Sequence, residues 1–74
     1  MSVHHSEEIH RNLIERVPQV TGKQLSEWFH EIDKGPSFLR FDERVNWLRD
    51  EHALPHGYAY AICREHERHR VSHE

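Results

Sequence analysis

The sequence predicts an all-α fold, a compact bundle of four short helices in a single domain. The chain has 74 residues, which is enough for one domain. Apolar residues recur at helical spacing in four segments, and turn-forming residues separate these segments. The single cysteine cannot form an intrachain disulfide, so stability must come from an apolar core, a metal or a partner subunit.

The first predicted helix covers about residues 7–17. Acidic residues at positions 7 and 8 suit the positive end of its dipole. Its expected inward face consists of Ile9, Leu13, Ile14 and Val17. Pro18 has no backbone N–H to continue the hydrogen-bond pattern, so we expect this helix to end at about Val17.

The second predicted helix covers about residues 22–34. Thr21 is followed three residues later by Gln24, a spacing typical of a capping box at a helix N-terminus. The inward face is the clearest in the chain and consists of Leu25, Trp28, Phe29 and Ile32. Gly35 and Pro36 end the helix.

The third predicted helix covers about residues 41–52, and the fourth begins at about Gly57 and extends at least to His66. The inward positions of the third helix are Phe41, Val45 and Leu48, with Trp47 beside them, and those of the fourth are Ala59, Ile62 and Cys63. We therefore expect a flexible N-terminus at 1–6, a helical domain at 7–66, and a charged, His-rich helix end or tail at 67–74.

Two stretches carry a resemblance to a known family. The first is Thr21-Gly22-Lys23 followed by Trp28, and the second is Val45-x-Trp47-Leu48-Arg49-x-Glu51-His52-x-Leu54-x-His56-Gly57-x-Ala59-x-Ala61-Ile62. Together they resemble a bacterial family of short proteins and modules known as domain of unknown function 4287. The resemblance covers about residues 13–62 and departs at Pro55 and Tyr60, where the family usually has Gly and a smaller polar residue. It implies a small helical domain with no established activity.

The candidate binding site lies at the junction of the third and fourth helices. It consists of Trp47, Glu51, His52, His56, Gly57 and Tyr58. One interpretation makes His52 and His56 polar contacts for a partner, with aromatic walls beside them and Gly57 allowing close backbone approach. The alternative is architectural, with both histidines satisfying backbone groups at the helix ends.

Metal binding and catalysis have little support in the sequence. His52, His56, Cys63 and His66 carry suitable ligand atoms for zinc, but no zinc-binding spacing such as Cys-x-x-Cys is present. A nucleophile needs a positioned base, and no such arrangement stands out. We therefore expect no metal, no cofactor, no catalytic residues and no enzymatic activity.

The charge balance bears on the kind of partner. The chain has 13 acidic residues against 10 Lys and Arg, which disfavours a dedicated nucleic-acid-binding protein. We expect a non-catalytic protein-interaction module or a small homo-oligomer that uses the junction surface. Nucleic-acid binding by the last two helices, in the manner of a helix-turn-helix, is the alternative. No apolar run is long enough for a membrane span, and the lone cysteine favours the cytoplasm.

Nine histidines are the unusual feature of the composition. We expect most of them at helix ends, turns or polar faces. Their full protonation would add nine charges to the net charge of −3 and give +6. Mild acid is therefore expected to alter solubility and association through surface charge before it alters the fold.

Overall fold

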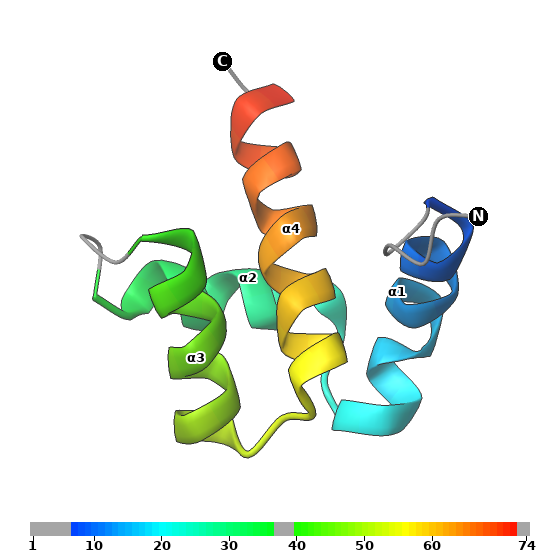
Figure 1. Ribbon diagram of the computed structural model, residues 1–74, viewed down its shortest axis with the longest axis horizontal. Coiled ribbons are helices and arrows are strands. Elements are labelled where there is room, and N and C mark those ends of the chain that lie inside the picture. Colours follow the sequence, from blue (N-terminus) through cyan, green and yellow to red (C-terminus); the bar gives the residue numbers. More distant parts are fainter. Residues whose placement is uncertain (1–6, 37–39, 73–74) are drawn as a thin grey trace.

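The computed structural model describes residues 7–36 and 40–72, with side chains up to residue 70. This part of the chain forms four helices and no strand: α1 (Glu7–Thr21), α2 (Leu25–Lys34), α3 (Phe41–His52) and α4 (His56–Ser72) (Figure 1). The predicted all-α class with four helices is confirmed. Residues 1–6, expected to form a flexible N-terminus, and 73–74, the end of the expected tail, lie outside the described residues.

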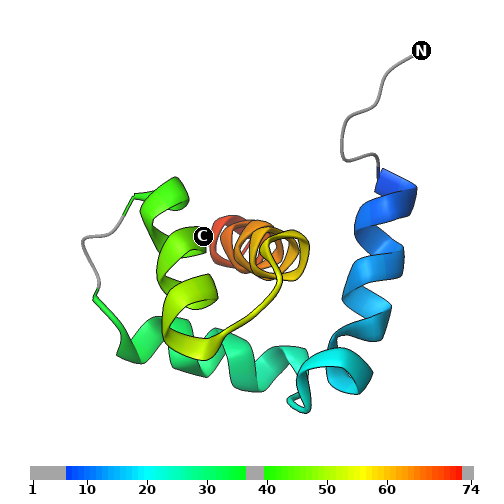
Figure 2. The ribbon, with the colours of Figure 1, turned by 60° about the horizontal axis from the view of Figure 1, so that its bottom comes forward.

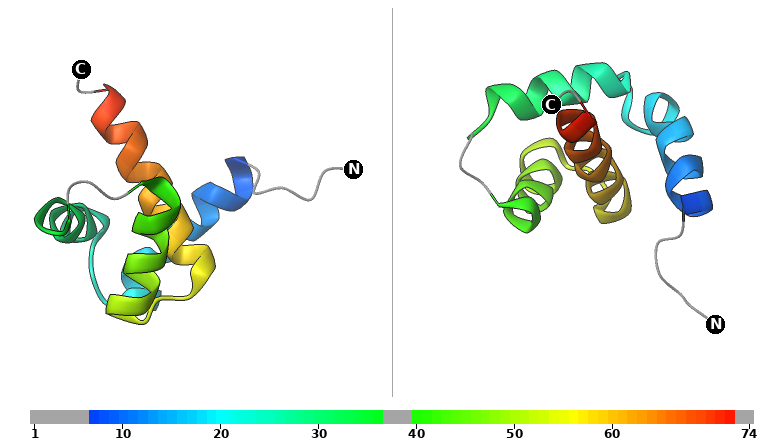
Figure 3. Two further views of the ribbon diagram at one scale, coloured as in Figure 1. Left: turned by 60° about the vertical axis from the view of Figure 1, so that its left-hand side comes forward. Right: turned by 90° about the horizontal axis from the view of Figure 1, so that it is seen from above.

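Helix α4 is the centre of the structure. It contacts each of the other three helices. Seen from above, α2 runs across one side of α4, and α1 and α3 lie on its two flanks (Figure 3). The turned view shows the same arrangement, with α4 between α1 and α3 (Figure 2). Because three helices pack on α4, its first half holds four of the fully buried residues: Ala59, Ala61, Ile62 and Cys63.

The predicted end of the first helix is wrong, because α1 continues through Pro18 to Thr21. A proline removes one hydrogen bond, and only a single turn comes after it here. The Thr21 hydroxyl donates to the carbonyl of Val17 at 2.6 Å. Gly22, the residue after the helix, forms its C-terminal cap through a left-handed φ of +82° and an N–H bond to the Pro18 carbonyl at 3.0 Å.

The predicted face of the first helix is also partly wrong. Ile9 is 48% exposed, whereas its neighbour His10 is 3% exposed. Ile14 and Val17 lie inward as predicted, whereas His10 takes the inward position expected for Ile9. The polar His10 is accommodated on this face because the carboxylate of Glu65 on α4 lies opposite it.

Helix α2 begins at Leu25, three residues after the predicted start. Gln24 is the residue before the helix, and its backbone N–H donates a hydrogen bond to Oε1 of Glu27 at 3.3 Å. Thr21 is the residue that the spacing predicts as the cap. Its hydroxyl instead hydrogen-bonds to the end of α1 and to the side chain of Trp28. Thr21 Oγ1 accepts a hydrogen bond from Nε1 of Trp28 at 2.8 Å.

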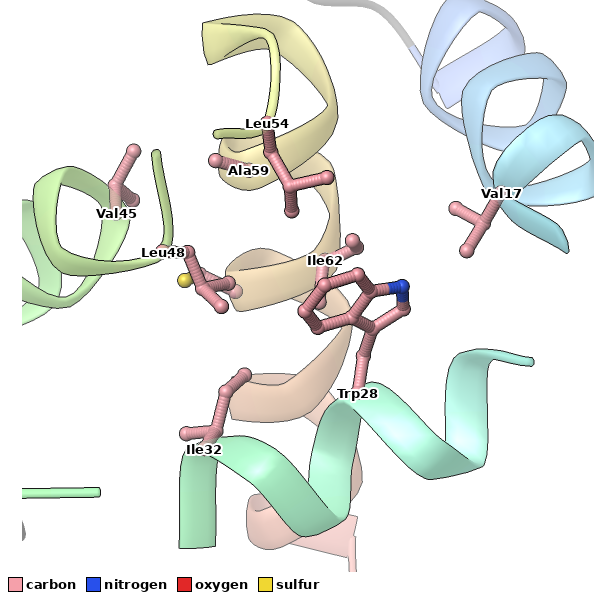
Figure 4. Packing of buried hydrophobic residues seen from close by; sticks show 9 residues of the cluster. Val17, Trp28, Ile32, Val45, Leu48, Leu54, Ala59 and Ile62 are labelled. Atoms are coloured by element: carbon pink, nitrogen blue, oxygen red, sulfur yellow. The ribbon is translucent and has the colours of Figure 1, made fainter. Parts of the chain in front are cut away.

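The core lies where α2 and α3 meet α4. Trp28 points from α2 into the space among Val17, Leu54 and Ile62 (Figure 4). Of the predicted inward positions of α2, α3 and α4, seven are buried: Trp28, Ile32, Val45, Leu48, Ala59, Ile62 and Cys63. The other three, Leu25, Phe29 and Phe41, are only half-buried.

The last two helices agree closely with the sequence prediction. Helix α3 has the predicted bounds, and α4 begins one residue earlier than expected and continues through residues 67–72. The turn between them starts at Ala53, which adopts a left-handed conformation with φ 55°. None of the helices in residues 7–36 and 40–72 has the length and apolarity needed to cross a bilayer.

Candidate functional site

The structure places His52 inside an aromatic cluster. Its ring meets Trp28 edge-on, with centroids 5.1 Å apart, and meets Trp47 edge-on at 5.5 Å. Its Nε2 is buried and has no hydrogen-bond partner among the described residues. His52 therefore packs α3 against α2 through ring contacts, a structural role that differs from the hydrogen bonds to backbone groups in the architectural alternative.

Trp47 covers the end of α2 at Gly35. A Cβ atom added at Gly35 would lie 2.8 Å from Cη2 of Trp47, closer than carbon atoms normally approach. At Gly57, by contrast, no atom of the described fold lies within 4 Å of an added Cβ.

The remaining residues of the predicted site do not converge with this cluster. Glu51, His56 and Gly57 are exposed, and Tyr58 is half-buried against the core. The structure thus brings Trp47 and His52 together by a direct ring contact but gives His56 different neighbours.

His56 lines a shallow depression between α3 and the start of α4. The depression has a volume of about 220 Å³ and is lined by Phe41, Asp42, Val45, Asn46, His56 and Tyr60. Its apolar part is set by the rings of Phe41 and Tyr60, which meet at 88° with centroids 5.5 Å apart. Of its six residues, the sequence prediction contains only His56.

Three polar side chains at the rim of the depression have no hydrogen-bond or ion-pair partner in the described fold. Asp42, Asn46 and His56 are exposed, and their side chains make no hydrogen bond or ion pair with the part of the chain that the structure describes. Asp42 lies in the first turn of α3, where a carboxylate suits the helix dipole. An apolar hollow edged by groups with unused hydrogen-bonding capacity is typical of a binding site.

Two histidines of the described fold are buried, whereas the sequence predicts most histidines at helix ends, turns or polar faces. His10 Nε2 lies 2.7 Å from Oε1 of Glu65, and His66 Nε2 lies 2.9 Å from Oδ1 of Asp33. Each pair joins a neighbouring helix to α4. The available signal for His66 is its position four residues after Ile62, on the inward stripe of α4.

Two of the four residues considered as metal ligands make other contacts. His52 packs between two tryptophans, and His66 pairs with Asp33. Within 7–36 and 40–72, no three His, Cys, Asp or Glu side chains come together in a way that could hold a metal ion. Burial raises the pKa of Cys63 to about 12, which leaves its thiol protonated and poorly nucleophilic at neutral pH.

Comparison with known proteins gives one match. A family model described as domain of unknown function (DUF4287) matches residues 9–68. The chain belongs to this family, and the resemblance seen in the sequence is confirmed. No curated protein and no solved structure matches the chain.

Proposed function

We propose that this member of the DUF4287 family is a non-catalytic protein-interaction module that binds a partner protein at the α3/α4 depression. One observation carries the proposal. Asp42, Asn46 and His56 surround an apolar hollow, and their side chains make no hydrogen bond or ion pair within the described fold. Solvated polar groups beside an exposed apolar floor favour a contact that buries the floor and pairs the rim.

Unlike the polar side chains at the depression, the charged side chains on the later part of α4 form ion pairs. Glu7 pairs with both Arg64 and Arg68, and the Arg68 hydrogen bond holds the pKa of Glu7 below its usual range. Glu67 lies 3.1 Å from Arg44 and 3.9 Å from Arg70. The three arginines of α4, Arg64, Arg68 and Arg70, lie among three carboxylates, those of Glu7, Glu65 and Glu67, so this part of α4 offers little net positive charge to a phosphate backbone. This pairing favours a protein partner over nucleic acid.

We also place the module in the cytoplasm. Cys63 is a buried free thiol, and a reducing compartment suits a domain whose only cysteine is unpaired. The apolar core and the histidine–carboxylate pairs connect the helices of the described fold, and a chain with one cysteine has no intrachain disulfide.

Site-specific photo-cross-linking tests the proposed surface. A photoreactive amino acid replaces Asn46 at the depression or, as the matched control, Arg16, an exposed helical residue of α1. In cells that express the protein, we expect protein adducts from position 46 and few from position 16. Equal adducts from the two positions, or none from position 46, would contradict the proposal.

A salt titration tests the alternative partner. Binding that depends on phosphate neutralisation weakens steeply as salt rises, with a slope set by the number of contacts. We expect weak association with duplex DNA or RNA, and no loss of it when Asn46 is changed to Arg. Tight, steeply salt-dependent binding that maps to α4 would instead support nucleic-acid recognition.

A further inference from the structure

We propose that the partner segment inserts one apolar side chain into the depression and places a lysine or arginine beside Asp42. This inference rests on the proposed function and names the chemistry of the ligand. It draws on three features of the site, namely the size of the hollow, the character of its floor and the charge of its rim.

The size of the hollow indicates a single side chain. Pockets for drug-sized ligands hold about 300–1,000 Å³, and this depression measures about 220 Å³. Its lining comes from the first half of α3 and the first two turns of α4. A hollow of this extent accommodates one anchoring residue of an exposed segment, which is how interface hot spots are commonly built.

The floor indicates that the inserted side chain is apolar. Phe41 and Tyr60 present their rings, and Val45 beneath them is 2% exposed and belongs to the core. An aliphatic or aromatic group placed there removes apolar surface from water on both sides of the contact. A polar side chain inserted there would lose its hydration without gaining a partner from the floor.

The rim indicates a neighbouring cation. Asp42 is the one lining residue with a carboxylate, and no described side chain neutralises it. Asp50, near the other end of α3, differs because Nε of Arg49 lies 3.2 Å from its Oδ1. A lysine or arginine beside the anchor would therefore gain an ion pair with Asp42, whereas a glutamate there would be repelled. The side chains of Asn46 and His56 remain available for hydrogen bonds with the partner's backbone.

Nuclear magnetic resonance titration of the full chain with short capped peptides tests the inference. The three peptides share a flexible frame and carry Leu-Lys, Leu-Glu or Ser-Lys at the centre. We expect Leu-Lys to shift the signals of Phe41, Val45 and Tyr60, and Leu-Glu to bind about five-fold more weakly at low salt. The preference should shrink as salt rises, because the pair is exposed. Ser-Lys should leave these signals unchanged.

Two matched variants isolate the charge. Asp42→Asn should make the Leu-Lys and Leu-Glu peptides bind alike, whereas Asp50→Asn, which removes a carboxylate from the same helix outside the depression, should leave the preference intact. The inference is wrong if Leu-Glu binds as well as Leu-Lys to the unaltered protein, or if the preference survives Asp42→Asn. Equal binding of both leucine peptides at the depression would leave the proposed function standing. If no peptide shifts these signals and position 46 gives no adducts, both fail.

Discussion

Replacing Gly35 with alanine tests the packing that joins the end of α2 to α3. Gly35 has φ −78° and ψ −170°, an extended conformation that alanine adopts without strain. The added methyl group would lie 2.8 Å from Cη2 and 3.0 Å from Cζ2 of Trp47. Since carbon atoms pack best at about 3.5–4.0 Å, the indole ring must move by about 1 Å.

The expected cost combines two opposing effects. Overpacking of this kind destabilises by about 1–3 kcal/mol. Replacing glycine by alanine also restricts the unfolded chain, which returns about 0.4–1 kcal/mol. We therefore expect Gly35→Ala to lower the free energy of unfolding by about 1–2 kcal/mol. The Tm should fall by about 4–8 °C for each kcal/mol.

Gly57→Ala is the matched control, because it adds the same methyl group where no atom lies within 4 Å. It should raise the free energy of unfolding by about 0.4–1 kcal/mol. Urea denaturation monitored by far-ultraviolet circular dichroism measures both variants. In a Trp47→Leu background, Gly35→Ala should lose most of its cost, because the shorter side chain leaves room. Equal costs with and without the indole ring would refute the proposed clash.

Three other substitutions test separate features of the fold. Thr21→Val leaves Nε1 of Trp28 without its acceptor and should lower the free energy of unfolding by about 1–3 kcal/mol, as measured by urea denaturation. The loss should be much smaller in a Trp28→Phe background, and equal losses in the two backgrounds would contradict the role of the hydrogen bond. Ala53→Gly should stabilise the chain by about 0.5–1 kcal/mol, since only glycine adopts φ 55° without a steric penalty; a loss of stability would show that the turn differs. The Cys63 thiol should resist thiol reagents until the chain unfolds. Its raised pKa gives a stability contribution, relative to Cys63→Ala, that is full below pH 9.0 and lost as pH rises toward about 12; a constant difference between the two proteins would refute this.

The architecture was predictable because helix formation depends on local sequence. The spacing of Trp28 and Ile32, or of Val45 and Leu48, marks an apolar stripe that must be buried in any packed arrangement. The Gly35-Pro36 pair likewise predicted the end of α2, because a proline after a glycine does not continue a helix. The bounds of α1 were less predictable, since the effect of a proline depends on the contacts that the next helical turn makes in space.

The candidate site was less accessible to sequence reasoning. The conspicuous residues of the junction, Trp47 and His52, are used in packing, whereas Asp42 and Asn46 carry no distinguishing pattern in the sequence. What distinguishes the rim residues is the lack of a partner within the described fold, a property that no spacing encodes. The buried histidines are a similar case, because a buried His10 requires Glu65, which lies 55 positions away in the chain.

The sequence by itself thus determined the number of helices, their approximate extents and the central stripe of the core. Helical periodicity fixes which residues share a face, and this information is local. Only the tertiary structure decided which face of α1 turns inward, which glycine must lack a side chain, and which polar groups remain unpaired at the surface of the described fold. Those properties depend on which helix lies opposite, and in this chain the opposing residues come from elements distant in sequence.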